Sequence, residues 1–132
     1  MPGTWLREIK LMKPLIYLAV PFTHNEKWVQ HLRYLLVTAI GDLLIRAGKD
    51  IFSPITESYM YQTIGNTGGT FSTWKAHDFL MLSKCDKLLV LTLPGWKESI
   101  GVTAEIQYAR RHKIPIEYLS VHELLPTLKE VI

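Results

Sequence analysis

Glu105 is the residue whose setting most suggests chemistry. It lies in a helix predicted from about Ile100 to His112, after the apolar run 88–93 and the helix breaker Pro94-Gly95. Its neighbours in the sequence are apolar, among them Val102, Ala104 and Ile106. We expect its carboxylate to be partly desolvated and held by the dipole of the helix N-terminus. An exposed helix glutamate is the alternative interpretation.

A second acid, Asp78, interrupts the apolar stripe HDFLMLSKCD, which is predicted to form the helix before the same strand. Two carboxyl groups that converge on one pocket can cleave a bond at an anomeric carbon. One attacks or stabilises the oxocarbenium-like centre, and the other gives a proton to the leaving group. The sequence alone does not bring the two acids together. Asp86 begins the strand and is predicted to be structural, because it can hydrogen-bond the backbone at the turn.

The elements that would position these acids follow from the hydrophobic pattern. The apolar run 15–20, bounded by Pro14 and Pro21, predicts a strand buried on both faces. Helical spacing from about 26 to 47 predicts a helix, capped by Asn25 or Thr23 and stopped by Gly48. The remaining predicted elements are a strand at 51–53, a helix from a cap at Ser72 or Thr73 to about Lys84, strands at 87–93 and 114–119, and a helix at 121–131 behind a Ser120–Glu123 capping box.

This order predicts a small doubly wound, mainly parallel α/β sheet of the flavodoxin-like class. Residues 1–13 are predicted to be an N-terminal extension, and 14–132 a single α/β domain. The segment 55–71 matches neither helix nor strand well, and we interpret it as a lid or an arm that reaches a neighbouring subunit. A disordered surface loop is the alternative. In such sheets ligands bind at the carboxyl ends of the strands.

The amino-acid composition indicates which kinds of binding partner to expect. The 132 residues carry a formal net charge of +3, without a run of Lys or Arg, so we expect no nucleic acid polymer as partner. The mild positive charge would suit an anionic small molecule, with ordinary surface charge as the alternative. Cys85 is the single cysteine and is predicted to be a small buried hydrophobe. No signal peptide or membrane span is recognisable, so we expect a cytoplasmic location, with no metal and no cofactor.

Three stretches carry a resemblance to a known family. They are Ile16-Tyr17-Leu18-Ala19, His77-Asp78-Phe79 with Asp86-Lys87-Leu88-Leu89-Val90 downstream, and Ser99-Ile100-Gly101-Val102-Thr103-Ala104-Glu105-Ile106 followed by Ala109. Together they resemble the nucleoside 2-deoxyribosyltransferase superfamily, including its deoxynucleoside 5′-monophosphate N-glycosidase branch. The resemblance covers roughly residues 14–119. It implies a nucleoside 2-deoxyribosyltransferase-like fold.

The resemblance also implies a mechanism. Glu105 would be the nucleophile on C1′ of a (deoxy)nucleoside or its 5′-monophosphate, and a glycosyl-enzyme ester would be resolved by water or a second base. Asp78 would be the general acid. Tyr17 matches an aromatic residue that touches the sugar or the nucleophile, with a core tyrosine as the alternative. The competing hypothesis is a nucleotide-binding or sensing module on the same fold without strong catalysis. A cytokinin-activating phosphoribohydrolase ranks low, because Pro94-Gly95 lacks the second glycine of that pattern.

The binding residues that the resemblance implies surround the helix start. Ser99 matches the place of a phosphate-binding serine in the monophosphate branch, with Lys97 nearby and Gly101 in the small-residue run. A plain N-cap serine is the alternative. Independently of the resemblance, aromatic residues often stack on ligands in pockets, and the candidates here are Trp96, Trp74, Tyr59 and Tyr61, with plain packing as the alternative for each.

The sequence differs from the monophosphate branch in the loop after the first predicted strand. Residues 20–25 lack the glycines that this branch has in its phosphate loop. His24 is a candidate to replace part of that phosphate loop, with a surface histidine as the alternative. Members of the superfamily often complete their sites from a neighbouring subunit. We therefore expect a small-molecule nucleoside or nucleotide as ligand and a homo-oligomer, a dimer or tetramer.

Overall fold

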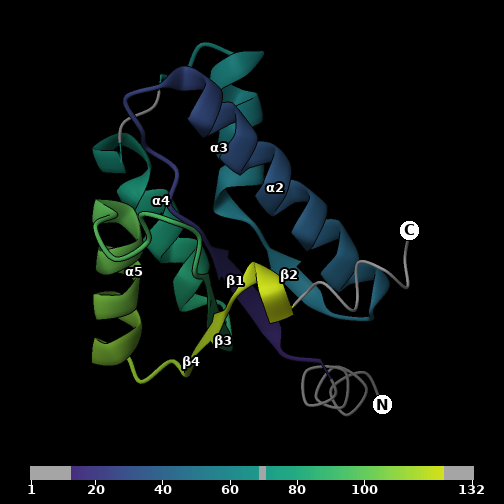
Figure 1. Ribbon diagram of the computed structural model, residues 1–132. Helices are drawn as coiled ribbons and strands as arrows, with labels where there is room; N and C mark the ends of the chain where they lie inside the picture. Colours follow the sequence, from purple (N-terminus) through teal and green to yellow (C-terminus); the bar gives the residue numbers. More distant parts are fainter. Residues whose placement is uncertain (1–12, 69–70, 124–132) are drawn as a thin grey trace, which may run out of the picture.

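The computed structural model of the chain describes residues 13–68 and 71–123. Its elements are, in order, β1 (Leu15–Ala19), α2 (Lys27–Arg46), β2 (Asp50–Phe52), α3 (Pro54–Thr63), α4 (Phe71–Ser83), β3 (Lys87–Leu91), α5 (Ile100–Arg111) and β4 (Ile116–Leu119). Figure 1 shows their arrangement. The predicted extension 1–13 lies almost wholly outside the described residues, as does the predicted last helix beyond Glu123.

The four strands form one sheet in the order β2-β1-β3-β4, and every neighbouring pair is parallel. Tyr17 of β1 lies opposite Phe52 of β2 on one side and Leu88 of β3 on the other. The chain runs outward from β1 to β2 and then returns to the other side of β1, so the strand order reverses between β1 and β3. The predicted small doubly wound, flavodoxin-like fold is confirmed.

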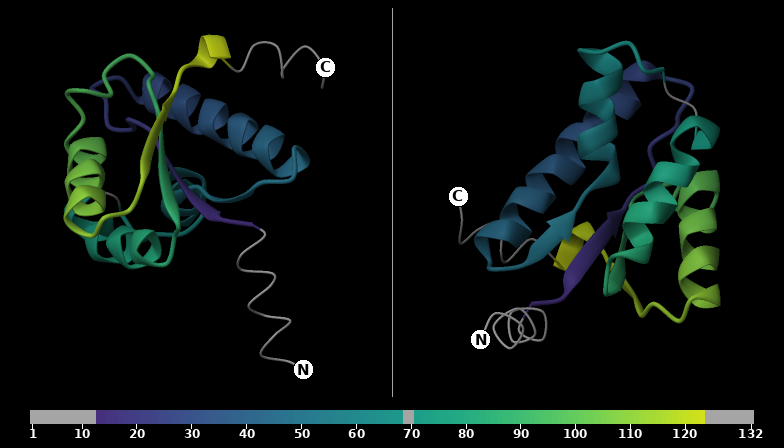
Figure 2. Two further views of the ribbon diagram at one scale, coloured as in Figure 1. Left: turned by 90° about the horizontal axis from the view of Figure 1, so that it is seen from below. Right: turned by 180° about the vertical axis from the view of Figure 1, so that it is seen from behind.

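Helices cover both faces of the sheet (Figure 2). Alternate side chains of β1 point to opposite faces because strand side chains have a period of two. Ile16 and Leu18 pack with Val37 and Ile40 of α2, whereas Tyr17 packs with side chains of α4 and α5. α3 packs beside α2. The side of the sheet that Tyr17 faces is therefore the side that carries α4 and α5.

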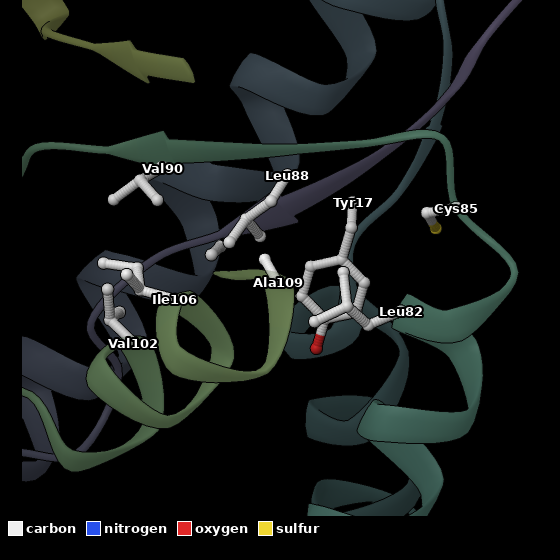
Figure 3. Close-up of a cluster of buried hydrophobic side chains, with 9 residues drawn as sticks. Tyr17, Leu82, Cys85, Leu88, Val90, Val102, Ile106 and Ala109 are labelled. Atoms are coloured by element: carbon white, nitrogen blue, oxygen red, sulfur yellow. The ribbon is translucent and has the colours of Figure 1, made fainter. Parts of the chain in front are cut away.

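Cys85 belongs to the cluster on that second face (Figure 3). Only 7% of the residue is exposed, and its thiol donates to the backbone oxygen of Met81 at 3.3 Å. Burial raises the pKa of the Cys85 thiol to about 11, with the charge of Asp86 as a second cause. A thiol in this state is a weak nucleophile, and the predicted role of a small buried hydrophobe is confirmed.

The interpretation of 55–71 as a lid or arm is wrong over its first part. Residues Pro54–Thr63 form α3, whose N-cap Ser53 accepts a hydrogen bond from the backbone N–H of Thr56. Pro54 occupies the first turn, where its missing N–H costs nothing, and Glu57 lies in the same turn. These residues form a helix-start pattern, which apolar periodicity alone does not reveal.

Two predicted caps are also wrong. α2 begins after Glu26, which makes no side-chain cap, rather than after Asn25 or Thr23. Ser72 and Thr73 lie inside α4 and not before it. Two other local predictions are confirmed. Gly48 follows α2 with φ of +87°, a conformation that glycine adopts without steric cost. Asp86 accepts the backbone N–H of Leu15 at 2.9 Å, which links the starts of β1 and β3.

α2 carries large apolar side chains on its outer face. Trp28, Leu32 and Leu35 are about half exposed or more, and their spacing places them on one stripe. Exposed apolar side chains that gather in this way often mark contact surfaces. The homo-oligomer expected from the sequence stays a prediction. A measurement of the molar mass of the protein in solution tests it. Among the helices of the described residues, none is both long and apolar enough to cross a membrane.

Candidate functional site

A cavity of about 530 Å³ opens at the carboxyl ends of β1 and β3, where the strand order reverses. The segment after β1 lines it, together with one side of α3, two side chains of α4 and the start of α5. This is the place where open α/β sheets bind ligands, because the loops on either side leave the sheet in opposite directions. Its volume is in the usual range for a small-molecule site.

Glu105 faces this cavity from the buried stripe of α5, which it shares with Val102, Ile106 and Ala109. Ser99 caps α5 by accepting the N–H of Val102 at 3.2 Å, and this fixes where the helix begins. Glu105 is only 5% exposed, so the alternative of an exposed helix glutamate is wrong. Burial raises the pKa of Glu105 to about 8, against the lowering effect of a hydrogen bond from Tyr17, and the charge of Asp78 adds to the rise.

Tyr17 stands behind Glu105, on the face of β1 that α4 and α5 cover. Its hydroxyl donates a short hydrogen bond to a carboxylate oxygen of Glu105. Burial and the charges of Glu105 and Asp78 raise the pKa of Tyr17 well above its usual range, so the phenol stays protonated. Tyr17 therefore orients the Glu105 carboxylate while its ring packs in the core, 5.8 Å from the ring of Phe52.

Asp78 reaches the same cavity from α4. It is 7% exposed and lies one turn before the fully buried Leu82, on the inner side of the helix. Burial raises the pKa of Asp78 to about 6, while His77 lowers it and Glu57 raises it. Among the described residues, no group hydrogen-bonds its Oδ1 atom. A buried carboxyl oxygen without a partner is costly, which suggests that a ligand completes this site.

Of the other predicted residues, Ser99 and Gly101 line the cavity and three do not. Lys97 places its ammonium 5.7 Å from the ring centre of Trp96. The Trp96 ring lies 5.5 Å from that of Tyr118 on β4, so it packs over the sheet edge. His24 accepts the backbone N–H of Glu26 through Nδ1 at the start of α2. The structure thus does not place Trp96, Lys97 or His24 in the cavity wall.

Trp74 lines the cavity, as expected for a residue that stacks on a base, whereas Tyr59 and Tyr61 do not. The indole is held from behind, because the Tyr61 ring stacks on it at 6.1 Å and its Nε1 donates to the Gly68 oxygen at 3.2 Å. His77 Nε2 and Glu57 Oε1 lie 2.6 Å apart and join α4 to α3. These contacts fix the wall formed by the two helices.

Ser58 and Gln62 of α3 also line the cavity, together with Glu98 before α5 and Gln30 of α2. Sequence reasoning did not identify any of these four. Ser58 and Gln62 are one helical turn apart, and recognising the Ser53-Pro54 start of α3 would have placed them on one face. For Glu98, nothing in the sequence except its position next to Ser99 indicated a place in the cavity wall.

Arg33 of α2 joins the segment after β1, which lines the cavity, to the loop between β3 and α5. Its Nη1 donates to the backbone oxygens of Phe22 and Thr23 at 3.3 and 3.1 Å, and its Nη2 to that of Pro94 at 3.0 Å. Gly95 passes close to this guanidinium with φ of +93°, and a Cβ there would lie 3.0 Å from Nη2. The clamp therefore needs both the long cation and the glycine.

Replacing Arg33 by Met should destabilise the protein by about 1–3 kcal/mol, because three carbonyl groups lose a charged donor. Chemical denaturation measures the change. The matched control is Arg46→Met, since Arg46 is exposed and pairs with exposed Asp42 at 3.6 Å. The control should stay within about 0.5 kcal/mol of the wild type. Equal losses in the two variants would contradict the role of Arg33 as a clamp.

The described residues contain no group of three or more His, Cys, Asp and Glu side chains that could hold a metal ion. The profile of a family described as "Domain of unknown function (DUF1937)" matches residues 14–121, which include every side chain of the cavity wall. No match was found among curated proteins.

Proposed function

The chain belongs to the DUF1937 family, and we propose that it cleaves or transfers the N-glycosidic bond of a nucleoside or its 5′-monophosphate. One observation carries this proposal. Two buried carboxyl groups, Asp78 from α4 and Glu105 from α5, line one cavity at the switch point of the sheet. A nucleophile and an acid on opposite sides of a sugar are what a retaining glycosyl transfer needs.

In the first step a carboxylate oxygen of Glu105 attacks C1′ and the C1′–N bond breaks. The electron pair of that bond goes to the base, which takes a proton from Asp78. The product is a glycosyl ester on Glu105. In the second step water or another base attacks C1′ and gives its proton to the Asp78 carboxylate, which frees Glu105. Two inversions give retention at C1′.

Tyr17 has a positioning role in this scheme. Its hydroxyl donates to the Glu105 carboxylate, and the interaction lowers the pKa of Glu105 against the effect of burial. The bond therefore favours the ionised nucleophile and holds one oxygen in a fixed direction, which leaves the other for C1′. The transition state favours the same ionised form, because positive charge develops at C1′ next to Glu105.

The protonation of the pair predicts a bell-shaped pH profile. Burial raises the pKa of Asp78 to about 6 and that of Glu105 to about 8, so between these values the pair carries one proton. Because Glu105 has the higher pKa, most of the singly protonated pair holds the proton on Glu105, and the reaction uses the smaller fraction that holds it on Asp78. We expect kcat/KM to be highest near pH 7 and to fall on both sides, about tenfold per pH unit at the extremes. A rate that keeps rising above pH 9 would contradict the shared proton.

A panel of nucleosides and 5′-monophosphates tests the proposal, with release of the free base followed by chromatography. At least one member should lose its base in the presence of the wild-type protein and not of Glu105→Gln. The alternative is a nucleotide-binding module on the same fold. This alternative is favoured if the protein cleaves no compound of the panel while one of the compounds raises its melting temperature.

A further inference from the structure

Among the described residues that line the cavity, the ionisable side chains are all acidic. They are Asp78, Glu98 and Glu105, and none of the described wall residues is Lys, Arg or His. The protein as a whole has a net charge of +3, so the acidic cavity is a local arrangement and does not follow from composition. A concave site with charges of one sign raises the local concentration of ligands with the opposite charge.

The basic side chains around the cavity are directed to other partners. Arg33 donates to three backbone oxygens, and Lys97 lies against the ring of Trp96. His77 pairs with Glu57 at 2.6 Å. None of these contacts leaves a cation of the described residues directed at the ligand, so a phosphate in the cavity would meet the carboxylates of Asp78 and Glu98 without a positively charged partner.

The N-terminus of α5 would attract an anion, as would that of α3, whose Pro54 and Ile55 also line the cavity. At α5 the cap occupies one amide of the first turn, since Ser99 accepts the N–H of Val102 through Oγ at 3.2 Å. Glu98 directly precedes the cap and lines the cavity. Its negative charge opposes the binding of a phosphate at this helix end.

Two observations besides the acidic charge point to a ligand with positive charge. Asp78 is more than nine-tenths buried, faces the cavity, and has an Oδ1 atom that no described residue hydrogen-bonds. Trp74 and Phe22 add aromatic surface to the same wall. A cation gains from both, through charge pairing with a desolvated carboxylate and through the quadrupole of an aromatic ring.

We propose that the cavity selects its nucleoside by positive charge: it favours a nucleoside whose base is cationic, such as a pyridinium or N-alkylated base, and excludes a 5′-phosphate. This inference rests on the proposed function and narrows its substrate class. With such a base, the electron pair of the C1′–N bond neutralises the ring nitrogen as the bond breaks. The base then leaves without needing a proton, and water later gives its proton to the Asp78 carboxylate.

Three matched ligands test the inference. Nicotinamide riboside carries the pyridinium cation, its dihydro form has nearly the same shape without the charge, and nicotinamide mononucleotide adds only the 5′-phosphate. Dissociation constants from calorimetry on Glu105→Gln, in which turnover is expected to be blocked, separate binding from cleavage. We expect nicotinamide riboside to bind at least about tenfold more tightly than its uncharged dihydro form. The 5′-phosphate of the mononucleotide should weaken binding by a similar factor.

Glu98→Gln should reduce the preference for the cation by about threefold or more, because it removes one charge from the rim. Glu117→Gln is the matched control, since Glu117 lies on β4 and pairs with Lys87 at 3.1 Å. It should leave the preference unchanged. Equal binding of the charged and uncharged ribosides, tighter binding of the 5′-phosphate, or no binding of any of the three would overturn the inference.

The same experiments separate this inference from the function on which it rests. If uncharged nucleosides lose their base in a Glu105-dependent reaction and the cation has no advantage, the function stands and charge selection is wrong. If the cationic riboside binds with the expected preference and the wild-type protein cleaves no nucleoside, charge selection stands and the proposed reaction is wrong.

Discussion

Glu105→Gln should abolish base release, with a loss of about 10³-fold or more in kcat. The amide has nearly the size of the carboxylate but does not attack C1′, so the glycosyl ester cannot form. Its oxygen can still accept the hydrogen bond that Tyr17 gives to Glu105. Because the substitution keeps shape and polarity, loss of activity should come without loss of structure. Initial rates of base release measure the effect.

The same variant should be more stable than the wild type at alkaline pH. Burial raises the pKa of Glu105 from about 4.5 to about 8, so the folded protein holds a proton that the unfolded chain releases. This contribution to stability is fully present below about pH 4.5 and is lost as the pH rises through 8. Glutamine has no proton to lose. At pH 8 we expect Glu105→Gln to gain roughly 2–4 kcal/mol over the wild type, and far less at pH 5.

Urea denaturation at the two pH values measures this gain, and Glu117→Gln, at an exposed position of β4, is the control that should show none. A variant that is inactive and also less stable than the wild type at pH 8 would contradict the account. In that case the loss of activity would reflect damage to the fold, and Glu105 would be a structural residue. An active Glu105→Gln protein would contradict its role as nucleophile directly.

Asp78→Asn should lower the rate of base release by about 10²–10⁴-fold for substrates whose base must be protonated to leave. The loss should shrink to about tenfold for an activated substrate with a 4-nitrophenolate leaving group, because that group leaves without a proton. The dependence on the leaving group distinguishes an acid catalyst from a residue that only shapes the cavity. Asp78 also has an Oδ1 atom without a partner among the described residues, so the amide should be tolerated.

Asp86→Asn is the matched control for Asp78. Asp86 accepts the backbone N–H of Leu15 at the start of β1, away from the cavity wall. Its replacement should change stability without changing the ratio of rates between the two leaving groups. If Asp78→Asn lost the same factor on both substrates, Asp78 would not be the proton donor, and another residue of the wall would have to replace it.

The sequence predicted the parts of the fold that depend on local pattern. β1 and β3 are continuous apolar runs, which in an α/β protein are buried by helices on both faces. For Ser99 a plain N-cap serine was the alternative to a phosphate-binding residue; in the structure it caps α5, and this fixes Glu105 on the inner side of the helix. The burial of Glu105 therefore followed from spacing along one helix, once the helix start was known.

Contacts between distant segments could not be predicted in the same way. Trp96 is of a residue type that often stacks on ligands. In the structure, however, its ring contacts Tyr118 of β4, more than twenty residues later in the chain. α3 was missed because its core-facing side chains are few, with only Pro54 and Ser58 buried. Without α3, neither the far wall of the cavity nor its lack of basic residues could be recognised from the sequence.

The most direct test of the central claim is mass spectrometry of the protein mixed with a 2′-fluorinated nucleoside, which slows breakdown of a glycosyl ester. The account predicts a mass increase equal to one fluorinated sugar, located on the peptide that contains Glu105 and absent from Glu105→Gln. Release of the base with no adduct on Glu105, or an adduct on any other residue, would contradict it.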